Sequence, residues 1–74
     1  MDEASELRQL GAAMRVFRSG LGLSQELFAD KIGMHRAYYG AIERGAQNIT
    51  VSTLTKICSG LGVSASEVLG EAGL

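Results

Sequence analysis

The 74-residue sequence contains no proline and no tryptophan, and it has one cysteine and one histidine. The single cysteine, Cys58, cannot form an internal disulfide bond, and one cysteine with one histidine provides too few ligands for a structural zinc site. A chain this short buries one core at most, so we predict a single domain over residues 1–74 with its core in 7–70. Such a domain must gain its stability from packing and, we expect, from self-association.

Long apolar runs are also missing, because charged residues interrupt the sequence at short intervals. A membrane-spanning helix needs roughly 20 consecutive apolar residues, so no membrane span is expected. The segment 1–6 is acidic and lacks the basic start and apolar centre of a secretory signal. These features predict a cytoplasmic protein, with residues 1–4 and 71–74 frayed.

The residue types needed for catalysis are scarce. The sequence offers no nucleophile, base and orienting group at a plausible spacing, no phosphate-binding glycine loop and no set of metal ligands. We therefore expect no enzymatic activity, no cofactor, no metal and no small-molecule ligand.

Charge is unevenly distributed, although the formal net charge is only −1. Residues 7–60 contain all seven basic residues and three of the eight acidic ones, a net +4, and the other acids lie at the two ends. A basic middle segment with acidic flanks permits a surface that binds a polyanion.

Apolar residues recur with helical spacing, and glycines separate the periodic segments, so we predict an all-α fold with five helices. In the first helix, Leu7, Leu10 and Met14 share one face, and the glycine at position 11 suggests close packing of another backbone. Ser64 and Glu67 form a capping-box pattern at the start of the last helix. The predicted helices cover residues 5–19, 24–32, 35–44, 48–61 and 64–69.

The second and third predicted helices are short and are joined by a tight turn at Gly33, which is the spacing of a helix-turn-helix. The sequence then resembles the phage-repressor-like (XRE-type) helix-turn-helix family over about residues 7–70. Within that family it is most similar to short stand-alone regulators such as restriction–modification controller proteins. The resemblance rests on the order of four segments: Gly22-Leu23-Ser24-Gln25-Glu26-Leu27-Phe28-Ala29, Ile32-Gly33, Ile42-Glu43-Arg44-Gly45 and Leu61-Gly62-Val63-Ser64. It implies a compact lambda-repressor-like fold and a DNA-binding transcription regulator in a bacterial or phage-type cytoplasm, associated with the nucleoid.

In a helix-turn-helix, the N-terminal residues of the second helix approach base edges in the major groove. Arg36 can pair bidentately with guanine, and the small residues of the same helix allow a close approach or contact a thymine methyl group. Close packing between helices is an equally good explanation of the small residues. The predicted base contacts are Arg36, Ala37, Gly40 and Ala41.

Several polar residues match family positions that contact the DNA backbone, or can reach a phosphate by their place on the helix. Capping alone also explains Thr50. For Tyr38 the alternative is a surface aromatic residue with no role in DNA binding. Helical geometry separates Tyr38 from Tyr39 by about 100°, so we expect Tyr39 in the core and Tyr38 outside. The predicted backbone contacts are Gln25, His35, Tyr38, Arg44, Asn48 and Thr50.

The resemblance also implies an ion pair between Arg18 and Glu43 that holds the recognition helix. Three positions depart from the family pattern. His35 replaces a common Ser or Thr cap, which weakens the expected cap. Leu27 replaces a polar residue and is expected to be exposed or to contact a partner. Cys58 stands where alanine is common and is expected to be a buried small residue.

A single recognition helix makes few base contacts, so we predict a homodimer that binds a palindromic operator. The alternative is an antitoxin-like protein-interaction module whose DNA binding is autoregulatory. An antitoxin usually needs an extra segment to cover its toxin, and few residues follow the fourth helix. The predicted dimer interface consists of apolar residues at the C-terminal end: Val63, Val68, Leu69 and Leu74.

Overall fold

The structure, a computed structural model, describes residues 2–74, and within them it contains five α-helices and no strands. The all-α, five-helix prediction is thereby confirmed. Over this range no helix is both long enough and apolar enough to cross a membrane. The helices are α1 (Glu3–Gly20), α2 (Gln25–Lys31), α3 (Arg36–Glu43), α4 (Val51–Leu61) and α5 (Ala65–Ala72).

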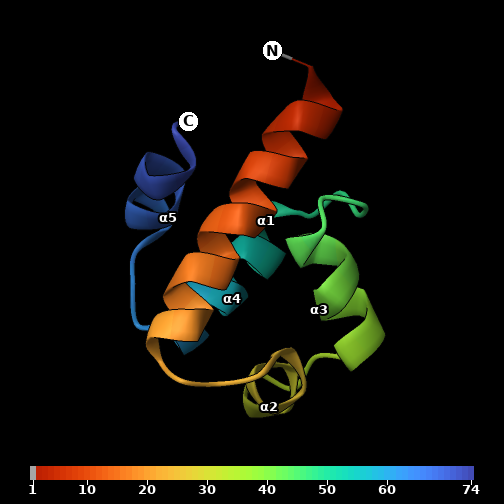
Figure 1. Ribbon diagram of the computed structural model, residues 1–74, viewed down its shortest axis with the longest axis vertical. Helices are drawn as coiled ribbons and strands as arrows, with labels where there is room; N and C mark the ends of the chain where they lie inside the picture. Colours follow the sequence, from red (N-terminus) through yellow and green to blue (C-terminus); the bar gives the residue numbers. More distant parts are fainter. Residues whose placement is uncertain (1) are drawn as a thin grey trace.

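The long helix α1 is the scaffold of the molecule. It contacts α3 on one side and α5 on the other, while α4 lies behind it and α2 lies near its C-terminal end (Figure 1). The helix begins two residues before the predicted start because Asp2 caps it, with the Asp2 Oδ1 atom accepting a hydrogen bond of 2.7 Å from the Ser5 amide. Residues 3 and 4, expected to be frayed, are thus helical; Met1 lies outside the described residues.

The pair α2 and α3 forms the helix-turn-helix. Ser24 caps α2 by accepting a hydrogen bond of 3.1 Å from the Leu27 amide. Gly33 has a φ of 67°, a left-handed conformation that lets the chain reverse within a few residues. His35 caps α3, since its Nδ1 atom accepts a hydrogen bond of 3.2 Å from the Ala37 amide. The expectation that histidine weakens this cap is therefore wrong: the imidazole takes the place of a serine or threonine oxygen.

The last two helices also begin at side-chain caps. Thr50 caps α4 through a hydrogen bond of 3.1 Å from the Thr53 amide to its hydroxyl oxygen. The predicted capping box of Ser64 and Glu67 opens α5. This helix continues to Ala72, three residues beyond the predicted end, so residues 71 and 72 are helical rather than frayed.

One core joins all five helices. Its largest fully buried side chains are Tyr39, Phe28, Met14, Ile57 and Val68, and Cys58 is buried beside them as predicted. The rings of Phe28 and Tyr39 tie α2 to α3, with centroids 5.0 Å apart. Because the exposed fraction of Val68 is 0%, its side chain packs within its own chain and is not available to the proposed dimer interface.

Gly11 explains how α3 approaches α1 so closely. A Cβ atom at this position would lie 2.3 Å from the carbonyl oxygen of Glu43 and 2.5 Å from that of Ile42. Both atoms belong to the backbone and cannot move aside cheaply, so only glycine allows this contact. The close packing predicted from a glycine within the first helix is confirmed, and it holds the C-terminal end of α3 in place.

Candidate nucleic-acid interface

The first turn of α3 presents its side chains outward. Arg36, Ala37 and Tyr38 are exposed, while Tyr39 and Ile42 are buried. The two adjacent tyrosines separate as predicted, since the exposed fraction is 37% for Tyr38 and 0% for Tyr39. The helix is thus fixed to the core by one face and leaves the other face free.

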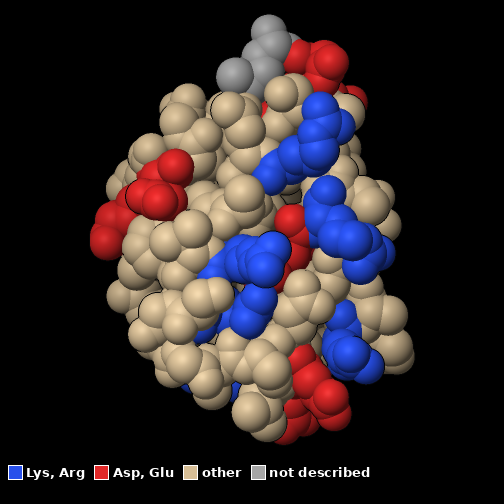
Figure 2. Space-filling model, in the orientation of Figure 1, with Lys and Arg blue, Asp and Glu red and all other residues tan. Residues whose placement is uncertain are grey.

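Basic side chains gather on the side of the molecule where α3 lies. Figure 2 shows Lys and Arg in a row there and over the middle of α1, with a small acidic patch between them, whereas the other Asp and Glu side chains in view lie at the start of α1, over α5 and near α2. Salt and distance screen exposed charges, so a polyanion approaching along the α3 side meets mainly positive potential. The charge separation expected from the sequence is therefore present in space.

A hollow of about 310 Å³ lies between the start of α2 and the exposed face of α3. Three of the predicted base-contacting residues, Arg36, Ala37 and Gly40, line it together. The fourth, Ala41, is half-buried and does not line it. The remaining lining residues are predicted backbone contacts, so the hollow unites two predicted sets: its lining is Gln25, His35, Arg36, Ala37, Gly40 and Arg44.

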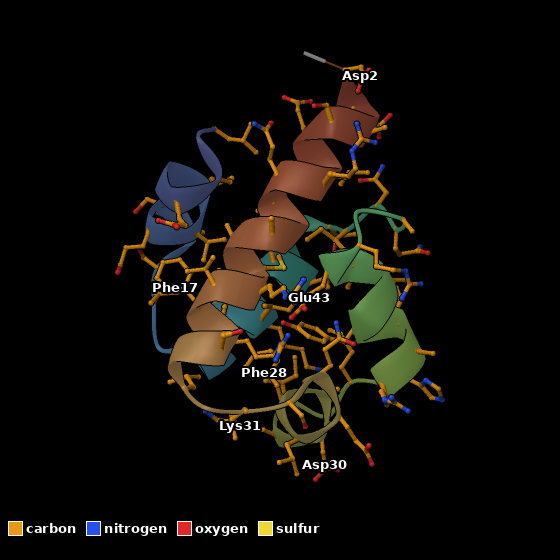
Figure 3. The ribbon with its side chains drawn as sticks, viewed as in Figure 1. Asp2, Phe17, Phe28, Asp30, Lys31 and Glu43 are labelled. Atoms are coloured by element: carbon orange, nitrogen blue, oxygen red, sulfur yellow. The ribbon has the colours of Figure 1, made fainter. Side chains whose placement is uncertain are left out.

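Beneath this surface, Arg18 of α1 and Glu43 of α3 form a buried ion pair. The Arg18 Nε and Nη2 atoms donate to the two carboxylate oxygens of Glu43 at 2.7 and 3.1 Å. Arg18 Nη1 also donates to the Leu23 carbonyl oxygen at 2.7 Å, which ties the end of α1 to the loop before α2. Figure 3 shows Glu43 facing inward between α1 and α3, where this bidentate pair fixes the recognition helix.

The carboxylate of Glu43 also accepts hydrogen bonds from Gln25 and Tyr39. Gln25 Nε2 lies 2.9 Å from Glu43 Oε1, and the Tyr39 hydroxyl donates to Oε2. Burial alone would raise the pKa of Glu43, but the hydrogen bonds from Arg18, Tyr39 and Gln25 outweigh burial and lower it. Burial, followed by the bond to Glu43, raises the pKa of Tyr39, so its hydroxyl stays protonated as a donor.

This lowered pKa makes stability depend on pH. In the unfolded chain Glu43 titrates near its ordinary value of 4.5, and in the folded chain it titrates below that. Its contribution to the unfolding free energy is complete above the unfolded value and is lost as the pH falls through the folded one. We expect the melting temperature to fall as the pH drops below about 4.5, and to fall less in Glu43→Gln, as circular dichroism at 222 nm would show. An equal fall in both proteins would assign the acid sensitivity to other carboxylates.

The loop after α3 holds the remaining predicted backbone contacts. Thr50 caps α4, and the side-chain amide of Asn48 donates to Glu3 Oε1 at 2.8 Å. The start of α1 packs against this loop at Gly45, where an added Cβ would lie 2.6 Å from the backbone of Arg8. The amide group available to a DNA phosphate at Asn48 is thus already bound to a carboxylate of the same chain.

Sequence reasoning missed two parts of this site. Tyr39 belongs to the Glu43 network as well as to the core, and the spacing of four residues between them on one helix could have predicted their contact. The hydrogen bond between Glu3 and Asn48 joins residues 45 positions apart, and no local sequence pattern predicts it. Leu27, which stands where the family is usually polar, is 59% exposed, as one of its two expectations had it.

No group of three or more His, Cys, Asp or Glu side chains that could hold a metal ion occurs among residues 2–74. The arrangement offers hydrogen-bond donors, positive charge and small apolar residues on one convex helix. Such groups can bind the phosphates and base edges of DNA.

Comparison with known proteins agrees with this geometry. The control protein C.MunI of a Mycoplasma species is 45% identical over 49 residues, 66% of each chain. The control protein C.SmaI of Serratia marcescens is 38% identical over 65 residues, 88% of this chain and 77% of that protein. The chain therefore spans about two thirds to three quarters of the length of these two relatives.

Solved structures show the same fold. The restriction-modification controller protein C.AhdI from Aeromonas hydrophila superposes with a TM-score of 0.85 at 32% identity, covering 92% of this chain and 99% of that one. The clp gene regulator ClgR from Corynebacterium glutamicum gives a TM-score of 0.86 at 32% identity, covering 92% and 88%. The sequence model of the helix-turn-helix family HTH_3 matches residues 14–68. This chain, with its two short helices joined at Gly33, belongs to that helix-turn-helix family of transcription regulators.

Proposed function

We propose that the protein is a sequence-specific regulator of transcription that binds duplex DNA through α3. The observation that carries the proposal is the first turn of α3, where Arg36 and Ala37 are exposed and line a hollow at the surface. An α-helix fits the major groove, and an arginine at its N-terminal end can pair with the O6 and N7 atoms of guanine. A regulator of this kind acts in the cytoplasm, on the nucleoid.

The active form is a homodimer on a palindromic operator. Two copies related by two-fold symmetry place their recognition helices about 34 Å apart, one turn of DNA, and double the base contacts. The interface consists of the C-terminal apolar residues that the fold leaves accessible: Leu74 is 45% exposed, and Val63 and Leu69 are half-buried. The names of C.MunI, C.SmaI and C.AhdI support a restriction–modification controller as the biological role.

Selection of binding sites from a randomised duplex library tests this function. Recovered sites should share a palindrome, and fluorescence anisotropy should show binding at least about a thousandfold tighter than to scrambled DNA. The affinity should fall steeply with salt, because Lys and Arg side chains release counterions from the phosphates. Analytical ultracentrifugation of the same sample should show a dimer at micromolar concentration.

Unselective binding would contradict the proposal and would favour a protein-interaction module of the antitoxin type. Exposed Leu27 would then be the first place to look for the partner. Selective binding by a monomer that holds a half-site as tightly as a palindrome would contradict the dimer alone.

The carboxylate of Glu3 competes with DNA for the Asn48 amide. Replacing it in Glu3→Gln removes a negative charge beside the loop that approaches the phosphates, and it leaves the Asn48 amide with a neutral, weaker acceptor from which a phosphate can take it. We expect affinity to rise about twofold to fivefold for operator and scrambled DNA alike, since a phosphate contact carries no sequence information. Anisotropy titrations at about 0.1 M salt would measure the change.

The matched control is Glu71→Gln, the same charge change on an exposed residue of α5. If both variants tighten binding equally, net charge explains the effect and the bond between Glu3 and Asn48 plays no part. A second control is Glu3→Gln in an Asn48→Ala background, where we expect a smaller gain because the shared donor is gone.

A further inference from the structure

Arg8 is an exposed arginine of α1 that lies against the loop following α3. A Cβ atom added at Gly45 would lie 2.6 Å from both the backbone nitrogen and the Cα atom of Arg8, and 2.7 Å from its Cγ atom. Gly45 has a φ of 73° and directly follows Arg44, the residue that caps the C-terminal end of α3. The fold therefore brings α1 to the end of the recognition helix.

Two further contacts hold α1 in this position. On one side of Arg8, the Glu3 carboxylate accepts a hydrogen bond of 2.8 Å from Asn48 in the same loop. On the other side, Gly11 packs directly against the backbone at the end of α3. Because both contacts lie within about one and a half helical turns of Arg8, the backbone of this arginine has a fixed place relative to α3.

The guanidinium group of Arg8 has no partner within the chain. Among residues 2–74, no ion pair or side-chain hydrogen bond involves it. The residues at the pairing distances along the helix, Ala4, Ser5, Gly11 and Ala12, carry no charge. The group therefore provides positive charge and N–H donors at the surface without holding any part of the fold.

The end of α3 is the part of the recognition helix that approaches the walls of the groove. α3 has 8 residues and is about 12 Å long, which is also about the width of the major groove. When its first turn faces the base edges, its C-terminal end reaches the sugar–phosphate backbone that borders the groove. The row of Lys and Arg side chains in Figure 2 continues in this direction, from α3 to the start of α1.

Resting on the proposed function, we propose that α1 takes part in DNA binding. The Arg8 guanidinium binds a phosphate of the backbone that borders the groove, outside the stretch read by Arg36. The interface thus extends beyond the helix-turn-helix onto the scaffold helix. Such a contact fixes the orientation of the protein on the duplex and carries no sequence information.

The test replaces the phosphates of the selected operator, one at a time and symmetrically in both half-sites, by neutral methylphosphonates. At least one replacement in each half-site should weaken binding of the wild type and have no further effect on Arg8→Gln, because the two changes remove the same contact. Glutamine keeps the Cβ and Cγ atoms that pack at Gly45, so the variant should melt at the temperature of the wild type. Arg8→Lys keeps the charge and should bind more tightly than Arg8→Gln.

In anisotropy titrations, Arg8→Gln should weaken operator and scrambled DNA alike, by about fivefold to tenfold for each half-site at about 0.1 M salt. The salt slope of the dimer should fall by about 2, since two phosphate contacts are lost. Lys56→Gln is the matched control: it removes the same charge from an exposed residue of α4 that lines a hollow with Lys31 and Ser59. Figure 3 shows Lys31 on the side of α2 that points away from α3, so this control should keep the slope and the full methylphosphonate sensitivity.

Three results would overturn the inference. If every methylphosphonate weakens Arg8→Gln as much as the wild type, Arg8 binds no phosphate, while selective binding leaves the proposed function intact. Equal losses of affinity in Arg8→Gln and Lys56→Gln would assign the effect to net charge. Absence of any selected operator overturns the proposed function, and the phosphate contact of Arg8 with it.

Discussion

Arg18→Ala should remove a large part of the unfolding free energy at neutral pH. The substitution removes three hydrogen bonds at once, two to the Glu43 carboxylate and one to the Leu23 carbonyl oxygen. Glu43 would remain buried and charged, and losing one partner of a buried ion pair costs about 3 to 5 kcal/mol. A domain of 74 residues has a total unfolding free energy of roughly 4 to 11 kcal/mol, so this loss is about a quarter of the total at the least.

Urea denaturation followed by circular dichroism at 222 nm would measure the loss. Arg15→Ala is the matched control, because Arg15 is an exposed arginine on the same helix, and its unfolding free energy should stay within about 0.5 kcal/mol of the wild type. A small change in Arg18→Ala would mean that Gln25 and Tyr39 alone can hold the carboxylate of Glu43.

A second substitution separates the buried charge from the lost packing. Adding Glu43→Gln to Arg18→Ala removes the uncompensated charge and keeps a side chain of the same shape. The double variant should therefore be more stable than Arg18→Ala alone, although Glu43→Gln by itself should destabilise the wild type. A double variant that is the less stable of the two would show that the charge is not what makes the single change costly.

The five helices and the buried faces of Tyr39, Phe28 and Met14 were predictable from the sequence because they follow local rules. Glycines at helix ends, capping residues and the 3.6-residue period of apolar side chains all act within a few positions along the chain. The ends of helices were less predictable. Asp2 extends α1 and His35 caps α3 through single hydrogen bonds that depend on side-chain rotation.

The site was predictable only in part. Arg36 and Ala37 are exposed by their place on a helix whose other face is buried, which periodicity alone can show. That Gln25 donates to Glu43 and lies over Gly40 depends on how α2 crosses α3, and no spacing within either helix specifies that crossing. The burial of Val68 escaped prediction for the same reason, since apolar residues of a terminal helix suit a core and an interface equally well.

Arg36→Ala should have the largest effect on sequence recognition. The side chain is exposed at the first residue of α3 and lines the hollow, so its removal takes nothing from the core. Loss of a bidentate contact to guanine costs about 1 to 3 kcal/mol of discrimination in each half-site. A dimer loses it twice, so affinity for the full palindrome should fall by about 2 to 6 kcal/mol, while the melting temperature stays unchanged.

Repeating the site selection with this variant should flatten the preference at one base pair in each half-site and leave the rest of the palindrome in place. Tyr38→Phe provides the contrast: it removes one exposed hydroxyl next to Arg36, and a lost phosphate contact should weaken operator and scrambled DNA by the same factor. If the preference at every position survives Arg36→Ala, the guanine is read by another residue of α3 or by the shape of the DNA.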